Sequence, residues 1–128
     1  MKEIVAVLLC MIMLAGCSFS QKAKYQKISA EEAYSMMQGT NNYILLDVRT
    51  IEENKEKRIE GDILIPDFEI KDRAKNELPD KKAIILIYCR SGRRSANVAH
   101  ELIDMGYINV FDFGGIIDWP YETVSGER

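Results

Sequence analysis

The sequence predicts an α/β fold in which a parallel sheet of about five strands carries helices on both faces. Short apolar runs alternate along the chain with segments whose apolar residues have helical spacing, which is typical of such sheets. Two of these runs, residues 43–48 and 83–88, are almost continuously apolar, as expected for strands covered on both faces. The chain has 128 residues, of which 47% are hydrophobic and 29% charged, so one globular domain is expected.

The first helix and the first strand follow a polar segment. Ser29 and Glu32 have the spacing of a capping box, in which both side chains accept hydrogen bonds from free N–H groups at a helix start. The helix is expected to reach Gln38 and to end at Gly39. The apolar run over residues 43–48 is the first expected strand.

The middle of the chain holds shorter elements. Thr50 and Glu53 repeat the capping-box pattern, which predicts a short charged helix. Residues 63–65, directly before Pro66, are expected to form a short strand. A less regular helix is expected over residues 67–78.

The strongest strand pattern of the chain lies over residues 83–88. A helix is expected over residues 95–105, where apolar side chains recur at helical spacing and Gly106 follows as the stop. Residues 109–113 form the last expected strand.

The first 17 residues have the pattern of a bacterial lipoprotein signal. The apolar run over residues 4–15 is shorter than the roughly 20 residues that span a bilayer, and it matches the central region of a signal peptide. It ends in Leu14-Ala15-Gly16-Cys17, which resembles the lipobox where the lipoprotein signal peptidase cuts before a diacylglyceryl-modified cysteine. An uncleaved anchor, or an ordinary secretory signal with an incidental cysteine, is the alternative.

The lipobox resemblance implies an extracytoplasmic protein that lipid on Cys17 anchors to a bacterial membrane. The expected division is a lipoprotein signal peptide over residues 1–16, a lipidated N-terminus and tether over residues 17–27, and one domain over residues 28–128. Of the three cysteines, Cys10 would leave with the signal peptide and Cys17 would carry lipid. Cys89 would then be the only free thiol, so the mature domain forms no internal disulfide and Cys89 is the candidate reactive group.

Cys89 stands between the most apolar strand and a helix, at the strand end where parallel sheets bind ligands. The partial positive charge and free N–H groups of a helix N-terminus favour an anion and stabilise a thiolate. Gly92 permits backbone angles that turn several N–H groups inward. A buried structural cysteine is the alternative interpretation of this position. The residues expected to bind an anionic substrate around the nucleophile are Arg90, Ser91, Gly92, Arg93, Arg94 and Ser95.

Metal and nucleic-acid sites are not expected. His100 is the only histidine and the mature chain has no second thiol, so a tetrahedral set of soft ligands cannot form. His100 also lies about three helical turns from Cys89, which is too far for a Cys–His catalytic pair. The net charge of -3 lacks the basic excess of a nucleic-acid binder. We therefore expect no metal, no other cofactor and a monomer.

Four segments, in their order and spacing, resemble the rhodanese family. They are Ile28-Ser29-Ala30-Glu31-Glu32-Ala33, Leu46-Asp47-Val48-Arg49-Thr50, Cys89-Arg90-Ser91-Gly92-Arg93-Arg94-Ser95-Ala96, and Gly114-Gly115-Ile116 followed by Trp119. The resemblance implies the three-layer rhodanese fold and a sulfurtransferase activity. Cys89 would attack the outer sulfur of a small anionic donor such as thiosulfate, release sulfite and carry a persulfide, which a thiol or cyanide would then take.

Carried over by position, Asp47 and Arg49 border the same pocket. We expect Asp47 to accept hydrogen bonds from loop backbone and Arg49 to pair with an acidic neighbour. One segment departs from the family pattern, because Arg58 stands where the family commonly has His, and Asp62 where it commonly has Ala. This departure is expected to affect donor preference more than the fold.

Two other functions fit parts of the pattern. Cysteine-dependent phosphatases and arsenate reductases have five residues between the cysteine and an arginine, which would require arginine at position 95, where Ser95 stands. A rhodanese fold can also serve as a non-catalytic binding module or as a sulfur carrier.

Overall fold

The computed structural model describes residues 21–128. The expected signal peptide over residues 1–16 and the expected lipidation site, Cys17, lie outside the described residues. Within the described part of the chain, no helix has both the length and the apolar character that a membrane span requires.

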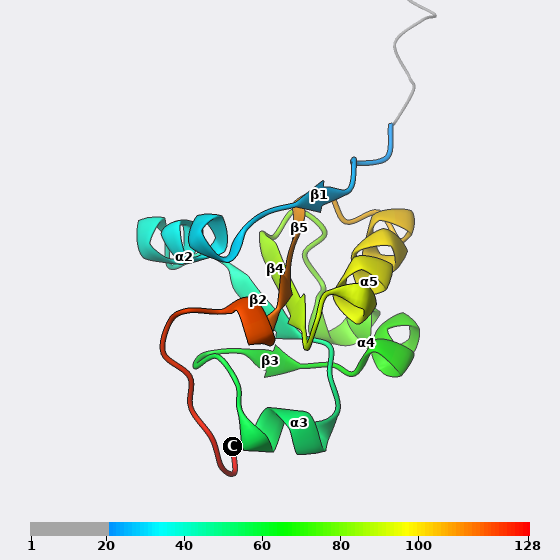
Figure 1. The fold of residues 1–128 in the computed structure, drawn as a ribbon. Coiled ribbons are helices and arrows are strands. Elements are labelled where there is room, and N and C mark those ends of the chain that lie inside the picture. The colour runs from blue at the N-terminus through cyan, green and yellow to red at the C-terminus, as the bar shows by residue number, and fades with distance from the viewer. Residues whose placement is uncertain (1–20) are drawn as a thin grey trace, which may run out of the picture.

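Five parallel strands form one sheet in the order β1-β5-β4-β2-β3 (Figure 1). They are β1 (Gln26–Lys27), β2 (Ile44–Asp47), β3 (Ile63–Leu64), β4 (Ile85–Cys89) and β5 (Val110–Gly115). The central strand, β4, is buried along its whole length, as its apolar run predicts.

Helices cover both faces of this sheet. They are α2 (Ala30–Gly39), α3 (Ile51–Glu56), α4 (Ile70–Glu77) and α5 (Arg93–Asp104), with short 3₁₀ turns at Asp67–Glu69 and Ile116–Asp118. Figure 1 shows α4 and α5 on one side of the sheet and α2 on the other. Two apolar cores match these sides, because one includes Ala74 of α4 and Leu102 of α5, and the other includes Ala33 of α2 and Trp119. The predicted three-layer α/β architecture is therefore confirmed.

Side chains fix the helix starts that the capping patterns predict. Ser29 Oγ accepts the Glu32 N–H at 3.0 Å at the start of α2, but the Glu32 side chain does not accept the Ser29 N–H, so the expected capping box is only half formed. At the start of α3, Thr50 Oγ1 accepts the Glu53 N–H at 3.2 Å, and a Glu53 carboxylate oxygen accepts the Thr50 N–H at 3.2 Å. This complete capping box begins α3 three residues after β2 ends, which brings α3 to the carboxyl edge of the sheet.

Several boundaries shift by one or two residues, and the helix expected over residues 67–78 is the 3₁₀ turn at Asp67–Glu69 followed by α4. Two further differences concern β1 and α5. Gln26 and Lys27, expected in the tether, form β1 and pair with β5. Both side chains are exposed, so they show no apolar pattern, and only the pairing with β5 makes them a strand. Helix α5 begins at Arg93 rather than at position 95, because Gly92 takes a left-handed conformation (φ +110°) and forms the N-cap.

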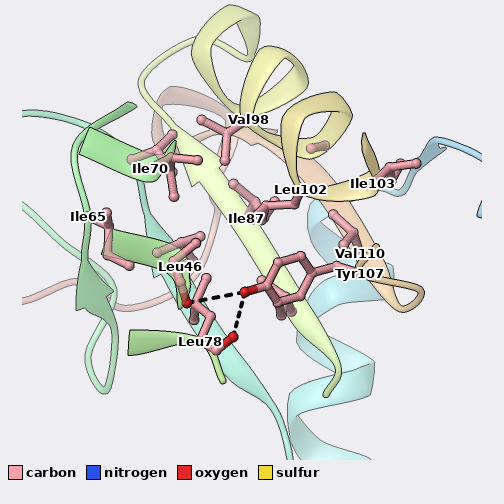
Figure 2. Packing of buried hydrophobic residues seen from close by; sticks show 14 of the residues in the cluster. Leu46, Ile65, Ile70, Leu78, Ile87, Val98, Leu102, Ile103, Tyr107 and Val110 are labelled. Carbon is pink, nitrogen blue, oxygen red and sulfur yellow. Dashed lines mark hydrogen bonds between the residues drawn. The ribbon is translucent and has the colours of Figure 1, made fainter. Parts of the chain in front are cut away.

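The larger core lies between the sheet and the layer of α4 and α5 (Figure 2). Leu46 and Ile87 from the sheet and Leu102 from α5 are fully buried in it. Tyr107 closes one end of this core. Its hydroxyl donates between the carbonyl oxygens of Leu78, at 2.5 Å, and Ala74, at 3.2 Å, where α4 ends. The Ala74 carbonyl also accepts the Leu78 N–H at 2.7 Å. Among the described residues, the Leu78 carbonyl receives only the tyrosine hydroxyl, so Tyr107 supplies the donor that this carbonyl needs.

Replacing this hydroxyl gives a test of the packing. We expect Tyr107→Phe to lower the free energy of unfolding by about 1–2 kcal/mol, because the Leu78 carbonyl loses its donor. Urea denaturation measures the change. Tyr43→Phe is the matched control, since the Tyr43 hydroxyl makes no hydrogen bond to any described residue. Equal unfolding midpoints for the Tyr107→Phe variant and the wild type would contradict this account of the core.

Candidate active site

Cys89 is the last residue of β4, and its side chain is enclosed by the loop that follows. It is a free cysteine with 1% exposure. The Gly92 N–H donates to Sγ at 3.0 Å, and Sγ lies 3.4 Å from Ser95 Oγ. The loop and the first turn of α5 therefore place two hydrogen-bonding groups directly on the sulfur.

The Ser95 hydroxyl can serve both charge states of the thiol. In the geometry described here, the Cys89 S–H donates to Ser95 Oγ, while the Ser95 hydroxyl donates to the Gly92 carbonyl at 3.1 Å. A hydroxyl hydrogen rotates freely, so it can turn towards Sγ when the thiol loses its proton. Ser95 is completely buried, so water does not compete for either bond.

The floor beneath the loop is Gly115, at the end of β5. The register of β4 and β5 shifts between Ile87 and Cys89, so that Cys89 pairs with Gly115. A Cβ atom on Gly115 would lie 2.6 Å from Ser91 Cα and closer still to the Arg90 carbonyl oxygen. That oxygen also accepts the Ile117 N–H at 3.3 Å. The φ of Gly115 is -111°, a value that any residue adopts. Glycine is therefore required here because a side chain has no room, and not because of the backbone conformation.

Arg94 is held by Glu53 of α3. Its two terminal nitrogens donate to the two carboxylate oxygens at 2.8 and 2.9 Å. Hydrogen bonding to Arg94 lowers the pKa of the Glu53 carboxyl to about 2. The pKa of Arg94 is raised, chiefly by its bond to Glu53 and to a smaller extent by negative charge on Cys89. Arg94 thus ties the start of α5 to α3 beside the sulfur.

The other two loop arginines, Arg90 and Arg93, are exposed. Neither forms an ion pair with any residue in the range 21–128. Arg90 lines a pocket of about 410 Å³ together with Ile116 and Ile117. Ser91 lines a second pocket, of about 390 Å³, with Gly114 and Gly115. The first pocket is also lined by Arg49, Lys57 and the carboxylates of Glu53 and Glu56, and Arg90 is its guanidinium without an ion pair among the described residues.

Asp47 and Arg49 form a buried pair at the end of β2. Two side-chain nitrogens of Arg49 donate hydrogen bonds to the Asp47 carboxylate at 2.9–3.2 Å, and the Arg49 backbone N–H donates to the same carboxylate at 2.9 Å. Arg49 also donates to the Lys57 carbonyl at 2.6 Å, and its guanidinium lies over the Tyr88 ring. Burial acts to lower the pKa of Arg49, but hydrogen bonding to Asp47, the negative charge of Asp47 and smaller contributions from Tyr88 together outweigh it, so the pKa is raised. These contacts join the end of β2 to Lys57, directly after α3, and to Tyr88 of β4.

A second polar group continues from this pair. Asn54 donates to both Asp47, at 2.9 Å, and Asp62, at 3.1 Å. Asp62 is buried and also accepts the Tyr88 hydroxyl at 2.6 Å and an Arg128 nitrogen at 2.6 Å. The group therefore reaches from the C-terminal segment to the residue that precedes Cys89.

Arg58 and Asp62, the two departures from the family pattern, both hold the C-terminal segment. Arg58 donates to the Gly126 carbonyl at 2.7 Å, and its backbone pairs with Val124 in an antiparallel bridge. Asp62 receives Arg128 at its carboxylate and at its carbonyl oxygen. In Figure 1 this segment, in red, runs down to the side of α3.

The structure brings Cys89, Gly92 and Ser95 into direct contact. Residues 21–128 contain no group of three His, Cys, Asp or Glu side chains able to hold a metal ion. Sequence reasoning missed the partner of Arg94, since Glu53 lies 41 positions away and showed only its capping role. It also missed Asn54 and Arg128, for which no sequence signal was available.

Comparison with known proteins gives one consistent result. Residues 29–120 match the family described as Rhodanese-like domain. Thiosulfate sulfurtransferase PspE of Escherichia coli (strain K12) is 36% identical over 81 residues, which cover 63% of this chain and 78% of that protein. The putative sulfur carrier protein YrkF of Bacillus subtilis (strain 168) is 35% identical over 105 residues, 81% of this chain and 51% of that protein.

Among solved structures, one described as rhodanese with anions from E. coli has a TM-score of 0.62 and 34% identity. The match covers 66% of this chain and 99% of that chain. The fold implied by the sequence resemblance is thereby confirmed.

The pair of Glu53 and Arg94 predicts a pH-dependent stability. We expect Glu53→Gln to lower the free energy of unfolding at pH 7 by about 1–2 kcal/mol, because Arg94 loses a charged partner. The pKa of Glu53 is about 2 in the folded protein, below the ordinary value of 4.5. Its contribution is therefore complete above pH 4.5 and is lost as the pH falls towards 2.

Urea denaturation at pH 7 and pH 3 checks this prediction. The difference between wild type and variant should be smaller at pH 3. Glu56→Gln is the control, since it makes the same change at an exposed position of α3 that has no ion pair with a described residue. A difference that does not change with pH would contradict the assigned role of the pair.

The contact at Gly115 predicts that no side chain is tolerated there. We expect Gly115→Ala to lower the free energy of unfolding by about 1–3 kcal/mol, as overpacking against backbone does. Gly39→Ala is the matched control, because a Cβ atom there meets nothing within 4 Å. Urea denaturation measures the free energy of unfolding of both variants. Equal stability of the two would show that the backbone of residues 90 and 91 moves away from a Cβ atom at little cost, which contradicts this prediction.

Proposed function

The chain belongs to the rhodanese-like domain family, and we propose that it is a sulfurtransferase that works through a persulfide on Cys89. The donor in this proposal is thiosulfate or a similar small sulfur-containing anion, and the acceptor is a thiol or cyanide. The observation that carries the proposal is the setting of the Cys89 sulfur. It accepts the Gly92 N–H at 3.0 Å and lies beneath a loop whose Arg90 and Arg93 are exposed.

In the first half of the reaction, the Cys89 thiolate attacks the outer sulfur of the donor. A bond forms between Cys89 Sγ and that sulfur, the S–S bond of thiosulfate breaks, and sulfite leaves with the electron pair. Arg90 and Arg93 attract the donor and stabilise the charge of the departing sulfite. The Gly92 N–H and the Ser95 hydroxyl support the thiolate before the attack.

In the second half, an acceptor thiolate attacks the outer sulfur of the Cys89 persulfide. The new bond joins the acceptor to that sulfur, and Cys89 leaves as a thiolate that is ready for another donor. Cyanide would leave as thiocyanate by the same step. Asp47, Arg49 and Arg94 serve in this scheme as the scaffold of the loop, since their charges are already paired.

A sulfur carrier is the second candidate, because one relative is described as a putative sulfur carrier protein. A carrier would accept sulfur on Cys89 and release it only to a dedicated partner. A phosphatase or arsenate reductase is disfavoured, since Arg94 closes the loop one residue early and is engaged by Glu53.

We also propose that the protein is extracytoplasmic and is anchored to a bacterial membrane by lipid on Cys17. The support is the lipobox-like segment Leu14-Ala15-Gly16-Cys17 at the end of a short apolar run. The domain is proposed to act as a monomer without a cofactor. A tethered site would meet donors and acceptors that lie outside the cytoplasm.

Intact mass spectrometry of membrane-extracted protein tests the proposal in one measurement. We expect a mass that fits lipid on a chain beginning at Cys17, and a gain of one sulfur atom after incubation with thiosulfate. Subsequent addition of cyanide should remove that sulfur and yield thiocyanate, because the persulfide is an intermediate.

Cys89→Ser is the control, and it should keep the lipid but gain no sulfur. Sulfur that stays on the wild-type protein in the presence of cyanide and small thiols would favour the carrier. Absence of any sulfur adduct with thiosulfate and with organic persulfides would overturn the sulfurtransferase proposal.

A further inference from the structure

Tyr25 enters the fold just before β1 and binds a buried carboxylate. Its hydroxyl donates to Asp112 Oδ2 at 2.5 Å, and Asp112 is completely buried in the middle of β5. Burial and the bond to Asp112 raise the pKa of the Tyr25 hydroxyl, which therefore remains a donor at neutral pH. The backbone repeats the link, because the Ile28 N–H donates to the Asp112 carbonyl at 2.9 Å.

The second oxygen of Asp112 fixes the backbone turn at Gly114, which lies within β5 directly before its last residue. Asp112 Oδ1 accepts the Gly114 N–H at 2.9 Å, and Gly114 takes a left-handed conformation (φ +83°). A buried carboxylate needs donors on both oxygens, because it has given up its water. Among the described residues, the Tyr25 hydroxyl and the Gly114 backbone N–H are the two donors to the Asp112 carboxylate.

The turn at Gly114 lies against the loop that encloses Cys89. The Gly114 carbonyl lies 3.5 Å from Ser95 Oγ, and its Cα would lie 3.6 Å from a Cβ placed on Gly92. The next residue, Gly115, is the floor of the loop. Any movement of the turn would therefore shift the groups that contact the sulfur.

Tyr25 also contacts α5, the other element that carries the loop. Its ring stacks on His100, with the ring centroids 4.5 Å apart and an angle of 18° between the planes. One side chain thus touches both β5 and α5, and it belongs to a segment that the sequence places in the tether.

We propose that Tyr25 is a positioning residue for the Cys89 loop and that it acts through Asp112, a role that rests on the proposed sulfurtransferase function. With Tyr25 in place, Asp112 holds Gly114, and Gly114 and Gly115 hold the loop in the conformation that points the Gly92 N–H at Sγ. Without the hydroxyl, one oxygen of a buried carboxylate has no donor, and the carboxylate must turn or take up a proton. The turn at Gly114 then loses its fixed acceptor.

The test compares two tyrosines that each lose only a hydroxyl. In Tyr25→Phe, we expect kcat for thiosulfate and cyanide to fall about tenfold with KM changed less than about twofold, as for a catalytic donor that is misplaced rather than missing. Tyr107→Phe should lose comparable stability and keep the wild-type kcat, since Tyr107 lies at the far end of α4. If both variants keep the wild-type kcat, Tyr25 is only structural and the proposal is overturned.

A double-mutant cycle tests the route through Asp112. Asp112→Asn keeps an acceptor for the Gly114 N–H and removes the buried charge. If Tyr25 acts through Asp112, the double variant Tyr25→Phe/Asp112→Asn should be no slower than the slower single variant. Independent, multiplying losses of kcat would overturn this route.

The rate at which iodoacetamide alkylates Cys89 at pH 7 separates this proposal from the proposed function. Tyr25→Phe should slow alkylation by a factor similar to the loss of kcat, because the misplaced Gly92 N–H supports the thiolate less well. A wild type that takes up no sulfur, with alkylation still slowed in Tyr25→Phe, would overturn the function and leave the positioning role in place. Unchanged alkylation with a sulfur-transferring wild type would overturn the positioning role alone.

Discussion

The backbone of residues 90 and 91 rests on Gly115 with no room for a side chain, and the rest of the site depends on this approach. The shift of register between β4 and β5 creates it, because the shift sets Cys89 opposite a glycine. With the floor in place, Gly92 can turn into its left-handed conformation and begin α5. The first turn of α5 then brings an N–H and a hydroxyl to the sulfur. A cysteine at the end of a strand becomes a candidate nucleophile through packing below it as much as through charge around it.

Charge in this acidic protein is distributed unequally around the loop. Arg94 and Arg49 are neutralised by carboxylates and hold α3, α5 and β2 together at the carboxyl edge of the sheet. Arg90 and Arg93 remain exposed and without ion pairs among the described residues, and Arg90 lines a pocket beside the loop. The loop therefore carries positive charge that carboxylates do not neutralise, while the net charge of the chain is -3. This local excess is what the proposed binding of an anionic donor would depend on.

Local patterns in the sequence predict much of the fold, and contacts between distant residues account for what they miss. Residues that are adjacent in the sequence specify the central strand, the two helix starts and the position of Cys89 after that strand. These features can therefore be predicted from short sequence patterns. The strand β1 has only exposed polar side chains, and β5 alone makes it a strand. The same limit applies within the site. The bonds from Glu53 to Arg94 and from Tyr25 to Asp112 join residues 41 and 87 positions apart, and neither partner reveals the other in the sequence.

The bonds between Arg58, Asp62 and the C-terminal segment have a consequence for how such chains diverge. A buried aspartate at position 62 is costly unless a donor such as Arg128 reaches it. In a chain with alanine at position 62, Arg128 would lose its carboxylate partner and keep only Asn54 Oδ1 and the backbone carbonyl of residue 62. Positions 58, 62 and 124–128 should therefore change together during evolution, so that a lineage either carries the whole set or lacks it. In an alignment, the charges at these positions would then mark a subgroup within the family, identified by covariation outside the Cys89 loop.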